Sequence, residues 1–244
     1  MRAILLAAGF GTRLRPITDH VPKALVPVDG RPLLEYWLHS LFNSGFERIL
    51  VNTHYKAEQV NDLIAHSRYS DRIDVVHEDT LLGTAGTLRK NAEFCEEGPC
   101  FVAHADNLCI CDFNAFQQAH KTRSPDCLMT MMTFDAPDPT QCGIVVTDEC
   151  GVVQEFHEKV HNPPGTKASA AVYIMERNVI DFIRGLTGEC PDLSNDVVPH
   201  FIGRIQTWHN DRYHIDVGTL TSFGMAQIDI KDHREFIANS GWFS

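Results

Sequence analysis

Two short segments near the start of the chain combine residues that can hold phosphate groups. Gly9-Phe10-Gly11-Thr12-Arg13 follows the apolar run Ile4–Ala7, and Lys23 stands directly after Pro22. Glycines let the backbone approach a bulky anion and point its N–H groups at phosphate oxygens. Arg13 and Lys23 add positive charge where phosphoryl chemistry builds up negative charge. The sequence therefore predicts a polyphosphate-binding loop at the end of a first strand.

Two common phosphate-binding loops do not fit this segment. Gly9-Phe10-Gly11 begins a dinucleotide fingerprint, but Leu14 stands where the third glycine is required. The second predicted strand ends in Val51-Asn52, with no acidic residue to bind a ribose. The Lys-Ser/Thr pair of a P-loop does not follow the glycines either. What is left is a loop charged by Arg13 and by the distant Lys23, which suits a triphosphate opened at its α-phosphorus.

Strand-like apolar runs alternate with segments of helical period through the first half of the chain. Because single helices between strands require crossover connections, the sheet is expected to be mainly parallel. Ligands bind beyond the carboxyl ends of such strands. The opening loop, Glu78–Gly83 and Asp106 all follow predicted strands, so they are expected to gather at one edge. Strands are predicted over 3–7, 48–51, 73–76 and 100–103, and helices over 32–44, 56–67, 84–94 and 112–121.

The second half of the chain is richer in strands. The 244 residues, 43% of them hydrophobic, can bury a proper core. No internal repeat or linker-like stretch interrupts them, so a single domain with a β-rich second lobe is expected. Strands are predicted over 127–134, 143–147, 152–156, 170–175 and 205–209, and helices over 177–185 and 219–230.

Charge and composition exclude several classes of function. The formal net charge of -11 disfavours broad binding to nucleic acid or to an anionic membrane. The amino terminus has no signal-like segment, and no apolar run reaches the roughly 20 residues that span a bilayer. A cytoplasmic location is expected. The eight cysteines lack paired Cys-x-x-Cys spacing, so we expect them to be mostly reduced packing residues.

The run His157-Glu158-Lys159-Val160-His161 matches the H-E-x-x-H pattern of zinc proteases. That chemistry requires both histidines on one face of a helix. Pro163-Pro164 follows almost at once and prevents a helix from continuing, while the preceding residues have strand character. The segment is therefore predicted to be a strand, and a zinc protease is disfavoured.

Nine segments together resemble the signature of a known family. They are Leu6–Leu14, Pro22-Lys23, Pro27-Val28, Leu82–Gly86, Ala105-Asp106, Cys142-Gly143, Glu158-Lys159, Ala170–Tyr173 and Asp216–Thr219. In this order they resemble the sugar-1-phosphate nucleotidyltransferases, and the resemblance covers nearly the whole chain. It implies an α/β fold, with a Rossmann-like, mainly parallel sheet flanked by helices and a β-rich sugar-binding lobe. One domain over 1–244 would then have a nucleotide-binding half, about 1–125, and a sugar-phosphate-binding half, about 126–244.

The resemblance also implies a reaction. An oxygen of a sugar 1-phosphate attacks the α-phosphorus of a nucleoside triphosphate, and pyrophosphate leaves, with no covalent intermediate on the protein. Arg13, Lys23 and Asp106 would be catalytic, with Asp106 and Asp216 holding Mg2+. The implied nucleotide-binding residues are Leu6, Ala7, Ala8, Gly9, Gly11, Thr12, Arg13, Lys23, Glu78, Gly83 and Thr84. The implied sugar-phosphate-binding residues are Gly143, Glu158, Lys159 and Ser169.

The substrates are less clearly marked than the reaction. Ser169 stands where many members have asparagine, which changes the sugar contacts. Glu78 would face the base, and an ionised carboxylate only accepts hydrogen bonds. Guanine offers two adjacent donors there, so GTP is favoured. The short length and His104–Asn107 also resemble the mannose-1-phosphate and heptose-1-phosphate guanylyltransferases.

Two alternatives stay open. Uridylyl or thymidylyl transfer to another hexose 1-phosphate fits the same motifs. A silent homologue that senses nucleotide sugars belongs to a different class, but it would be free to lose groups needed only in the transition state, and Arg13, Lys23, Asp106 and Asp216 are all kept. Finally, a homodimer is an expectation at the level of the family.

Overall fold

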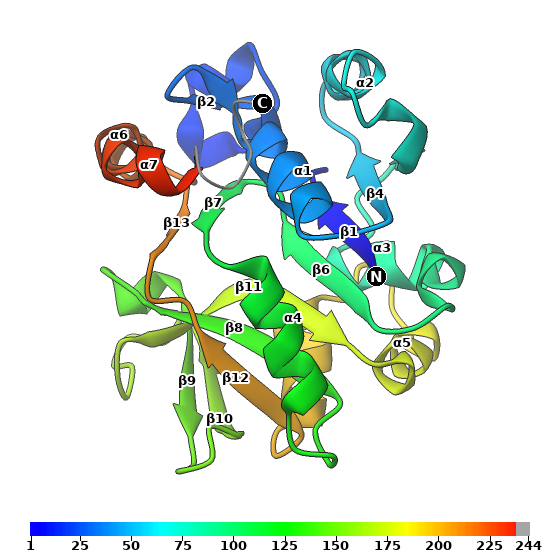
Figure 1. Cartoon of the computed structure of the whole chain (residues 1–244), viewed down its shortest axis with the longest axis vertical. Helices are drawn as coiled ribbons and strands as arrows, with labels where there is room; N and C mark the ends of the chain where they lie inside the picture. The colour runs from blue at the N-terminus through cyan, green and yellow to red at the C-terminus, as the bar shows by residue number, and fades with distance from the viewer. Residues whose placement is uncertain (238–244) are drawn as a thin grey trace. The chain divides into compact units, whose positions relative to one another are not determined.

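The computed structural model describes residues 1–237 and divides into two compact units (Figure 1). Unit 1 comprises Met1–Leu81, His104–Phe113 and residues 212–237. Unit 2 comprises Leu82–Ala103 and Asn114–Asp211. Each unit is thus assembled from segments that lie far apart in the sequence.

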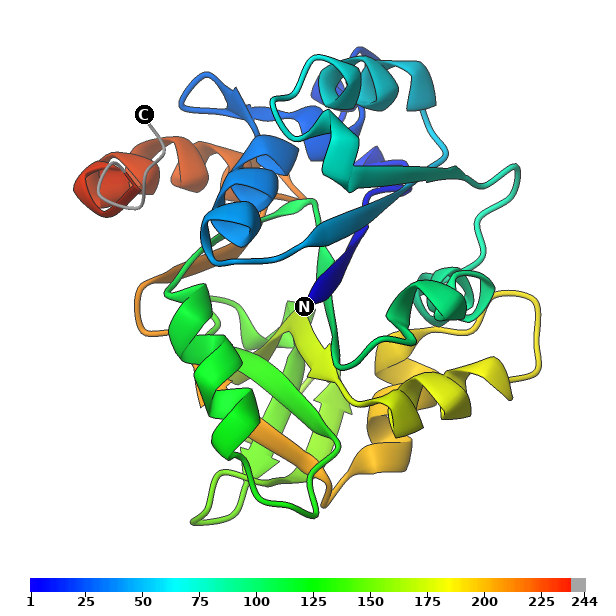
Figure 2. The ribbon, with the colours of Figure 1, turned by 45° about the vertical axis from the view of Figure 1, so that its right-hand side comes forward.

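Unit 1 is built on three parallel strands, β1 (Arg2–Leu6), β4 (Arg48–Thr53) and β5 (Ile73–His77). They lie side by side in that order (Figure 2), with Leu6 opposite Asn52 and Thr53 opposite His77. Their carboxyl ends therefore share one edge. Helices α1 (Leu33–Asn43) and α2 (Ala57–Ala65) form the connections into β4 and β5. Both helices bury one apolar face, as their helical period predicts.

A second sheet in unit 1 joins two distant segments. Strand β7 (Asn107–Ile110) pairs antiparallel with β13 (Tyr213–Asp216), and Leu108 and Ile215 pack into the same core. The indole N–H of Trp37 donates to the Asn107 carbonyl at 2.9 Å, which ties β7 to α1. The remaining named elements of this unit are β2 (Pro27–Val28), β3 (Arg31–Pro32), α6 (Leu220–Asp229) and α7 (Arg234–Ile237).

Unit 2 is mainly antiparallel. Its central strand β11 (Lys167–Met175) pairs with β6 (Cys100–His104), β8 (Met129–Asp135) and β9 (Gly143–Thr147). Strand β10 (Val153–Glu158) pairs antiparallel with β9, and β12 (Ile205–His209) lies parallel to β8. The helices that accompany this sheet are α3 (Thr84–Lys90), α4 (Phe113–Thr122) and α5 (Arg177–Arg184).

The α/β class is confirmed, and most predicted elements occur within a few residues of their expected bounds. The helix predicted over 84–94 is shorter, because α3 ends at Lys90 and a 3-10 turn over Ala92–Cys95 follows. Strands β7 and β13 were not predicted. Between residues 1 and 237, no helix is both long and apolar enough to cross a bilayer. All eight cysteines are free thiols, and five of them are buried.

Candidate functional site

The segment after β1 is a tight loop whose backbone is held from several sides. The N–H of Ala7 donates to Asn52 Oδ1 at 2.7 Å. Gly11 has φ +63°, and its carbonyl accepts from the Thr18 hydroxyl at 2.8 Å. A Cβ at Gly11 would lie 2.9 Å from Thr18 Cγ2 and 3.0 Å from Lys23 Cβ, whereas a Cβ at Gly9 would meet nothing within 4 Å. Gly11 is therefore required by the fold, and Gly9 is left open on the loop.

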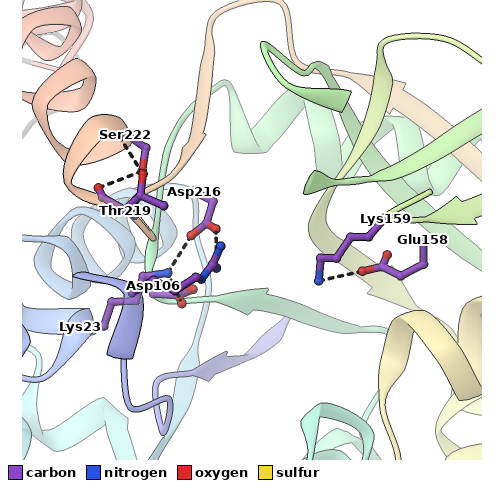
Figure 3. A network of polar contacts seen from close by, with 8 residues as sticks. Lys23, Asp106, Glu158, Lys159, Asp216, Thr219 and Ser222 are labelled. Carbon is purple, nitrogen blue, oxygen red and sulfur yellow. Dashed lines mark hydrogen bonds and ion pairs between the residues drawn. The ribbon is translucent and has the colours of Figure 1, made fainter. Parts of the chain in front are cut away.

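Lys23 is the buried cation of this region. Pro22 has an extended backbone and leads into a short 3-10 helix over Lys23–Leu25. The Lys23 side chain is 7% exposed, and Nζ donates to Asp106 Oδ2 and to Asp216 Oδ1, each at 2.7 Å (Figure 3). Burial by itself would lower the pKa of Lys23, but the two carboxylates outweigh it and raise the pKa above its ordinary value. The ammonium is therefore charged and fixed in place.

Asp106 lies in the turn between β6 and β7. The turn is anchored by the N–H of the preceding Ala105, which donates to the Leu6 carbonyl at 3.0 Å. Burial by itself would raise the pKa of Asp106, but the charge of Lys23 and, next, that of His104 hold it below its ordinary value. The second oxygen, Oδ1, is buried and has no hydrogen-bond partner among the described residues. Asp106 thus keeps an ionised carboxylate with one oxygen unused by the protein.

Asp216 reaches the same place through the pairing of β13 with β7. It is the last residue of β13 and lies opposite Asn107 in the register. Arg13 Nη2 lies 3.5 Å from Asp216 Oδ2. A Cβ at Gly218 would lie 2.7 Å from Asp216 Oδ2, so only glycine leaves room for the carboxylate. Thr219, next to Gly218, caps helix α6 (Figure 3), so Asp216 is not the capping residue of that helix.

Unit 1 therefore brings together four of the residues singled out from the sequence: Arg13, Lys23, Asp106 and Asp216. Their charges balance, two positive against two negative. Such a cluster can exchange partners, because an incoming anion can take the cations while a cation takes the carboxylates. The arrangement is suited to binding a phosphate chain together with a metal ion.

Glu78, which was predicted to lie against a base, follows β5 and is almost completely buried, with 1% exposed. Its carboxylate Oε1 accepts from Asn52 Nδ2 at 2.9 Å, and its carbonyl accepts from His54 Nδ1 at 2.7 Å. Asn52 was noted in the sequence only as a residue that is not acidic. Its signal was a polar residue that closes the apolar run Ile49–Val51 of a strand.

Gly83 and Thr84 lie in unit 2, at the start of α3. A Cβ at Gly83 would lie 2.5 Å from the Pro191 carbonyl oxygen. The Thr84 hydroxyl donates to Asp192 Oδ2 at 2.8 Å and accepts from the Leu193 N–H at 2.7 Å. Thr84 was predicted as a nucleotide-binding residue, and its hydroxyl has two partners within its own unit. Pro191 and Asp192, which buttress this turn, were missed by the sequence analysis.

The predicted sugar-phosphate residues lie on β9, β10 and β11 of unit 2. Gly143 and Glu158 are cross-strand partners, and a Cβ at Gly143 would lie 2.7 Å from Glu158 Oε2. Lys159 follows β10 with φ +49° and a side chain that is 63% exposed. Its Nζ lies 2.9 Å from Glu158 Oε1 (Figure 3). The pair offers an exposed cation beside a partly buried carboxylate.

Ser169 stands at an irregularity in β11. The register shifts between Ser169 and Tyr173, and Ala171 has φ +52°. The Ser169 oxygen lies 3.1 Å from the Tyr173 hydroxyl and accepts from the Ala171 N–H at 3.2 Å. Burial raises the pKa of Tyr173 to about 12, so the phenol stays protonated. Tyr173 belongs to the core and supports the bulge that presents Ser169.

The zinc-like run adopts the predicted strand. His157 and Glu158 are consecutive residues of β10, so their side chains leave opposite faces of the sheet. His157 Nε2 lies 2.8 Å from Glu155 Oε2, its neighbour two residues away on the same strand. The helix that a zinc protease requires is not formed here.

Comparison of the amino-acid sequence with known proteins identifies a family and several relatives. A family model described as nucleotidyl transferase matches residues 2–233. The chain is 31% identical over 201 residues to a protein of Sulfolobus acidocaldarius assigned as a mannose-1-phosphate guanyltransferase. This match covers 82% of this chain and 54% of that protein. It is 33% identical over 221 residues to the UTP–glucose-1-phosphate uridylyltransferase of Synechocystis, and this match covers 83% of this chain and 55% of that protein. The chain therefore spans about half the length of these curated relatives.

The fold also occurs among solved structures. A Bacillus anthracis protein described as a glucose-1-phosphate thymidylyltransferase superposes with a TM-score of 0.85. The two chains are 20% identical, and the match covers 95% of this chain and 96% of the other. This likeness concerns the fold alone.

Proposed function

The chain belongs to the nucleotidyl transferase family, and from that premise we propose that it is a sugar-1-phosphate nucleotidyltransferase. It would transfer a nucleotidyl group from a nucleoside triphosphate to a sugar 1-phosphate and release pyrophosphate. The observation that carries the proposal is the contact of Lys23 Nζ with both Asp106 and Asp216, next to a glycine loop that holds Arg13. These are the charges that a displacement at phosphorus requires.

In this reaction the loop from Leu6 to Thr12 holds the triphosphate, with the backbone N–H groups that follow Ala7 facing the phosphates. Arg13, whose side chain is 62% exposed, binds the two phosphates that leave as pyrophosphate. Lys23 neutralises the α-phosphate during attack, and its buried site keeps the ammonium from moving away. Glu78, Gly83 and Thr84 are assigned to the base side of the nucleotide.

The residues of the cluster fit a magnesium ion. Asp106 has a buried oxygen with no hydrogen-bond partner among residues 1–237, and Asp216 shares Lys23 with it. No three His, Cys, Asp or Glu side chains gather into a metal site in that part of the chain. Magnesium commonly takes one or two carboxylates and completes its shell with phosphate oxygens and water. Bound by Asp106 and Asp216, it would neutralise charge on the phosphates of the substrate.

Unit 2 supplies the groups assigned to the sugar phosphate. Lys159 would bind the phosphate of the acceptor, because its charge is exposed and Glu158 is its one acidic partner among residues 1–237. The Glu158 carboxylate would accept hydrogen bonds from sugar hydroxyls, and the backbone N–H at Gly143 would donate to one. The bulge at Ser169 would present the serine hydroxyl as a further group for the sugar. No general base is required to take a proton from the attacking oxygen, because a phosphate oxygen is already an anionic nucleophile.

For the substrates we propose GTP and a mannose- or heptose-type 1-phosphate. The relative from Sulfolobus acidocaldarius supports a guanylyl donor, and the relative from Synechocystis supports uridylyl transfer as the alternative. Retention of both cations and both carboxylates favours turnover over a silent sensor, because those groups act chiefly in the transition state.

Release of pyrophosphate, measured over a matrix of nucleoside triphosphates and sugar 1-phosphates with Mg2+, tests the proposal. We expect turnover with GTP and mannose 1-phosphate or a heptose 1-phosphate. A far higher kcat/KM with UTP or dTTP would replace the guanylyl assignment by the alternative. Tight binding of a nucleotide sugar without turnover on any pair would support the sensor.

A further inference from the structure

We propose that Asn52 is a positioning residue for the phosphate-binding loop, and that the buried carboxylate of Glu78 acts on that loop through Asn52. The inference rests on the proposed function, because it concerns how the triphosphate site is held. It gives Glu78 an effect on affinity that needs no contact with a base.

Asn52 stands where the three parallel strands of unit 1 end. Its side chain is buried between the residue that follows β1 and the residue that follows β5. Oδ1 accepts from the Ala7 N–H at 2.7 Å, and Nδ2 donates to Glu78 Oε1 at 2.9 Å. One amide group therefore joins the first residue of the phosphate loop to the first residue after β5.

The chemistry of the two partners fixes the orientation of the amide. A carboxylate can only accept, so Glu78 requires the NH2 end of Asn52. The opposite end, Oδ1, is then directed to the Ala7 N–H, which can only donate. If the amide were flipped, Asn52 Oδ1 would face the carboxylate of Glu78, acceptor against acceptor, and Nδ2 would face the Ala7 N–H, donor against donor. Both pairs would be buried without a hydrogen bond, which is costly. Glu78 thus determines which atom of Asn52 meets the loop.

The same segment after β4 holds the loop at further points. Phe10, at the middle of the loop, packs edge-on against His54, with ring centroids 5.2 Å apart. The Tyr55 hydroxyl donates to the Thr18 carbonyl at 3.0 Å, and the Thr18 hydroxyl donates to Gly11. The beginning, middle and end of the loop are therefore held by Asn52, His54 and Tyr55, the last of these through Thr18. Loss of the Asn52 contact therefore frees the loop at its first residue, and this effect does not depend on any contact with the base of the nucleotide.

A ligand without a base separates this role from base recognition. Inorganic tripolyphosphate offers the charged chain of a nucleoside triphosphate and nothing for a base-reading residue to contact. If Glu78 acts through Asn52, changes in the pair weaken binding of tripolyphosphate, GTP and UTP by a common factor. If Glu78 acts only by touching the base, tripolyphosphate is unaffected.

The experiment measures the affinity of the full chain for these three ligands with Mg2+ by isothermal titration calorimetry. Asn52→Leu removes both hydrogen bonds without changing the charge, and we expect about a tenfold loss for all three ligands. The double variant Asn52→Asp with Glu78→Gln keeps the charge and reverses the polarity of the pair. The carboxylate introduced by Asn52→Asp accepts from the Ala7 N–H and from the new amide, so we expect tripolyphosphate affinity within about threefold of the wild type. Asn61→Leu, at an exposed position of α2, is the matched control and should change nothing.

Several results would overturn the inference. They are an unchanged affinity of folded Asn52→Leu for tripolyphosphate, a loss confined to GTP, or a wild-type chain that does not bind tripolyphosphate. If Asn52→Leu does not fold, the charge-conserving double variant decides, and its failure to bind tripolyphosphate counts against the inference. The proposed function fails separately: if the variants behave as expected but no pair of substrates releases pyrophosphate, the loop assignment stands and the transferase does not.

Discussion

The two lysines singled out in this chain have opposite surroundings. Lys23 in unit 1 is 7% exposed and contacts two carboxylates, each at 2.7 Å. Lys159 in unit 2 is 63% exposed and contacts one carboxylate at 2.9 Å. Burial makes the first ion expensive unless its partners stay in place, whereas an exposed pair contributes about 0–1 kcal/mol to stability. The protein therefore fixes one charge in advance and leaves the other free to move.

This difference matches what the two assigned steps need. Charge at the reacting phosphorus has to be in place before the reaction, because reorganising it during the reaction would raise the barrier. A charge that captures an acceptor phosphate can instead exchange its weak internal partner for the ligand. The comparison predicts that changes in the unit 1 cluster reduce turnover, and that changes in unit 2 reduce the affinity for the sugar phosphate.

Asp106→Asn is expected to have the largest effect. The variant loses one assigned metal ligand and leaves the buried Lys23 with a single carboxylate, so kcat should fall by at least about 100-fold. Pyrophosphate release at saturating substrates measures it. Asp126→Asn, an exposed position in unit 2, is the control and should keep the wild-type rate. A folded Asp106→Asn protein with kcat close to that of the wild type would remove the cluster from catalysis.

Lys159→Met should separate the two units by kinetics. Methionine keeps much of the apolar stem and removes the charge, so the KM for sugar 1-phosphate should rise by about 10- to 100-fold. The affinity for the nucleotide and the Tm should stay the same, since the side chain is exposed. Lys121→Met, exposed on α4, provides the control. An equal loss in nucleotide affinity would contradict the separate roles of the two lysines.

Lys23→Met tests whether the buried ammonium occupies the place of the metal. In the wild type both carboxylates already contact the Lys23 ammonium, so binding of Mn2+, used as a paramagnetic substitute, should be weak without nucleotide. Without the ammonium, the paired carboxylates should bind Mn2+ at least about tenfold more tightly. Titration followed by electron paramagnetic resonance measures this, with Lys231→Met as the control. Equal affinities for Mn2+ would show that Lys23 does not compete with a metal.

Much of the cluster could be anticipated from the sequence, because its members stand next to strong local signals. Arg13 follows two glycines, Lys23 follows a proline, and Asp106 follows an apolar strand. Parallel strands place such residues at a common edge, which topology alone predicts. Local pattern and topology agree there, and the structure brings these residues together.

The remaining features depend on contacts between distant segments. Strands β7 and β13 are four residues each and contain cysteine and histidine, so no alternation marks them, yet their pairing brings Asp216 to Asp106. Asn52 is a polar residue that follows the apolar run Ile49–Val51, and its hydrogen bonds to Ala7 and Glu78 join it to segments distant in the sequence. The contact of Thr84 with Asp192 joins residues 108 positions apart. None of these pairings has a local signature.

A pH titration of stability should detect the same cluster. Asp106 has a pKa held below 3.8 in the folded chain, so its contribution to stability is present above that value and is lost as the pH falls through the folded pKa. The Lys23 contribution is lost only as the pH rises above 10.5. The difference in unfolding free energy between the wild type and Lys23→Met should therefore be largest between neutral pH and about pH 9 and shrink on acidification, because Asp106 takes up a proton at higher pH in the variant than in the wild type. Urea unfolding across this range measures it, and a difference that grows on acidification would contradict the ion pair.

Substitution of the two loop glycines, Gly9 and Gly11, should have the smallest effect. These variants test whether the backbone of the loop keeps the unit 1 cluster rigid. Gly11→Ala introduces a Cβ at φ +63°, 3.0 Å from Lys23 Cβ, and should lower stability by about 1–2 kcal/mol. Gly9→Ala meets no atom within 4 Å and should leave the Tm unchanged while weakening tripolyphosphate binding, because the new methyl group stands where the phosphates approach. Thermal unfolding and calorimetry on the two variants measure these effects. If Gly9→Ala instead lowers the Tm as much as Gly11→Ala and binds tripolyphosphate normally, the open face of the loop is structural, and the charge fixed at Lys23 has no phosphate site beside it.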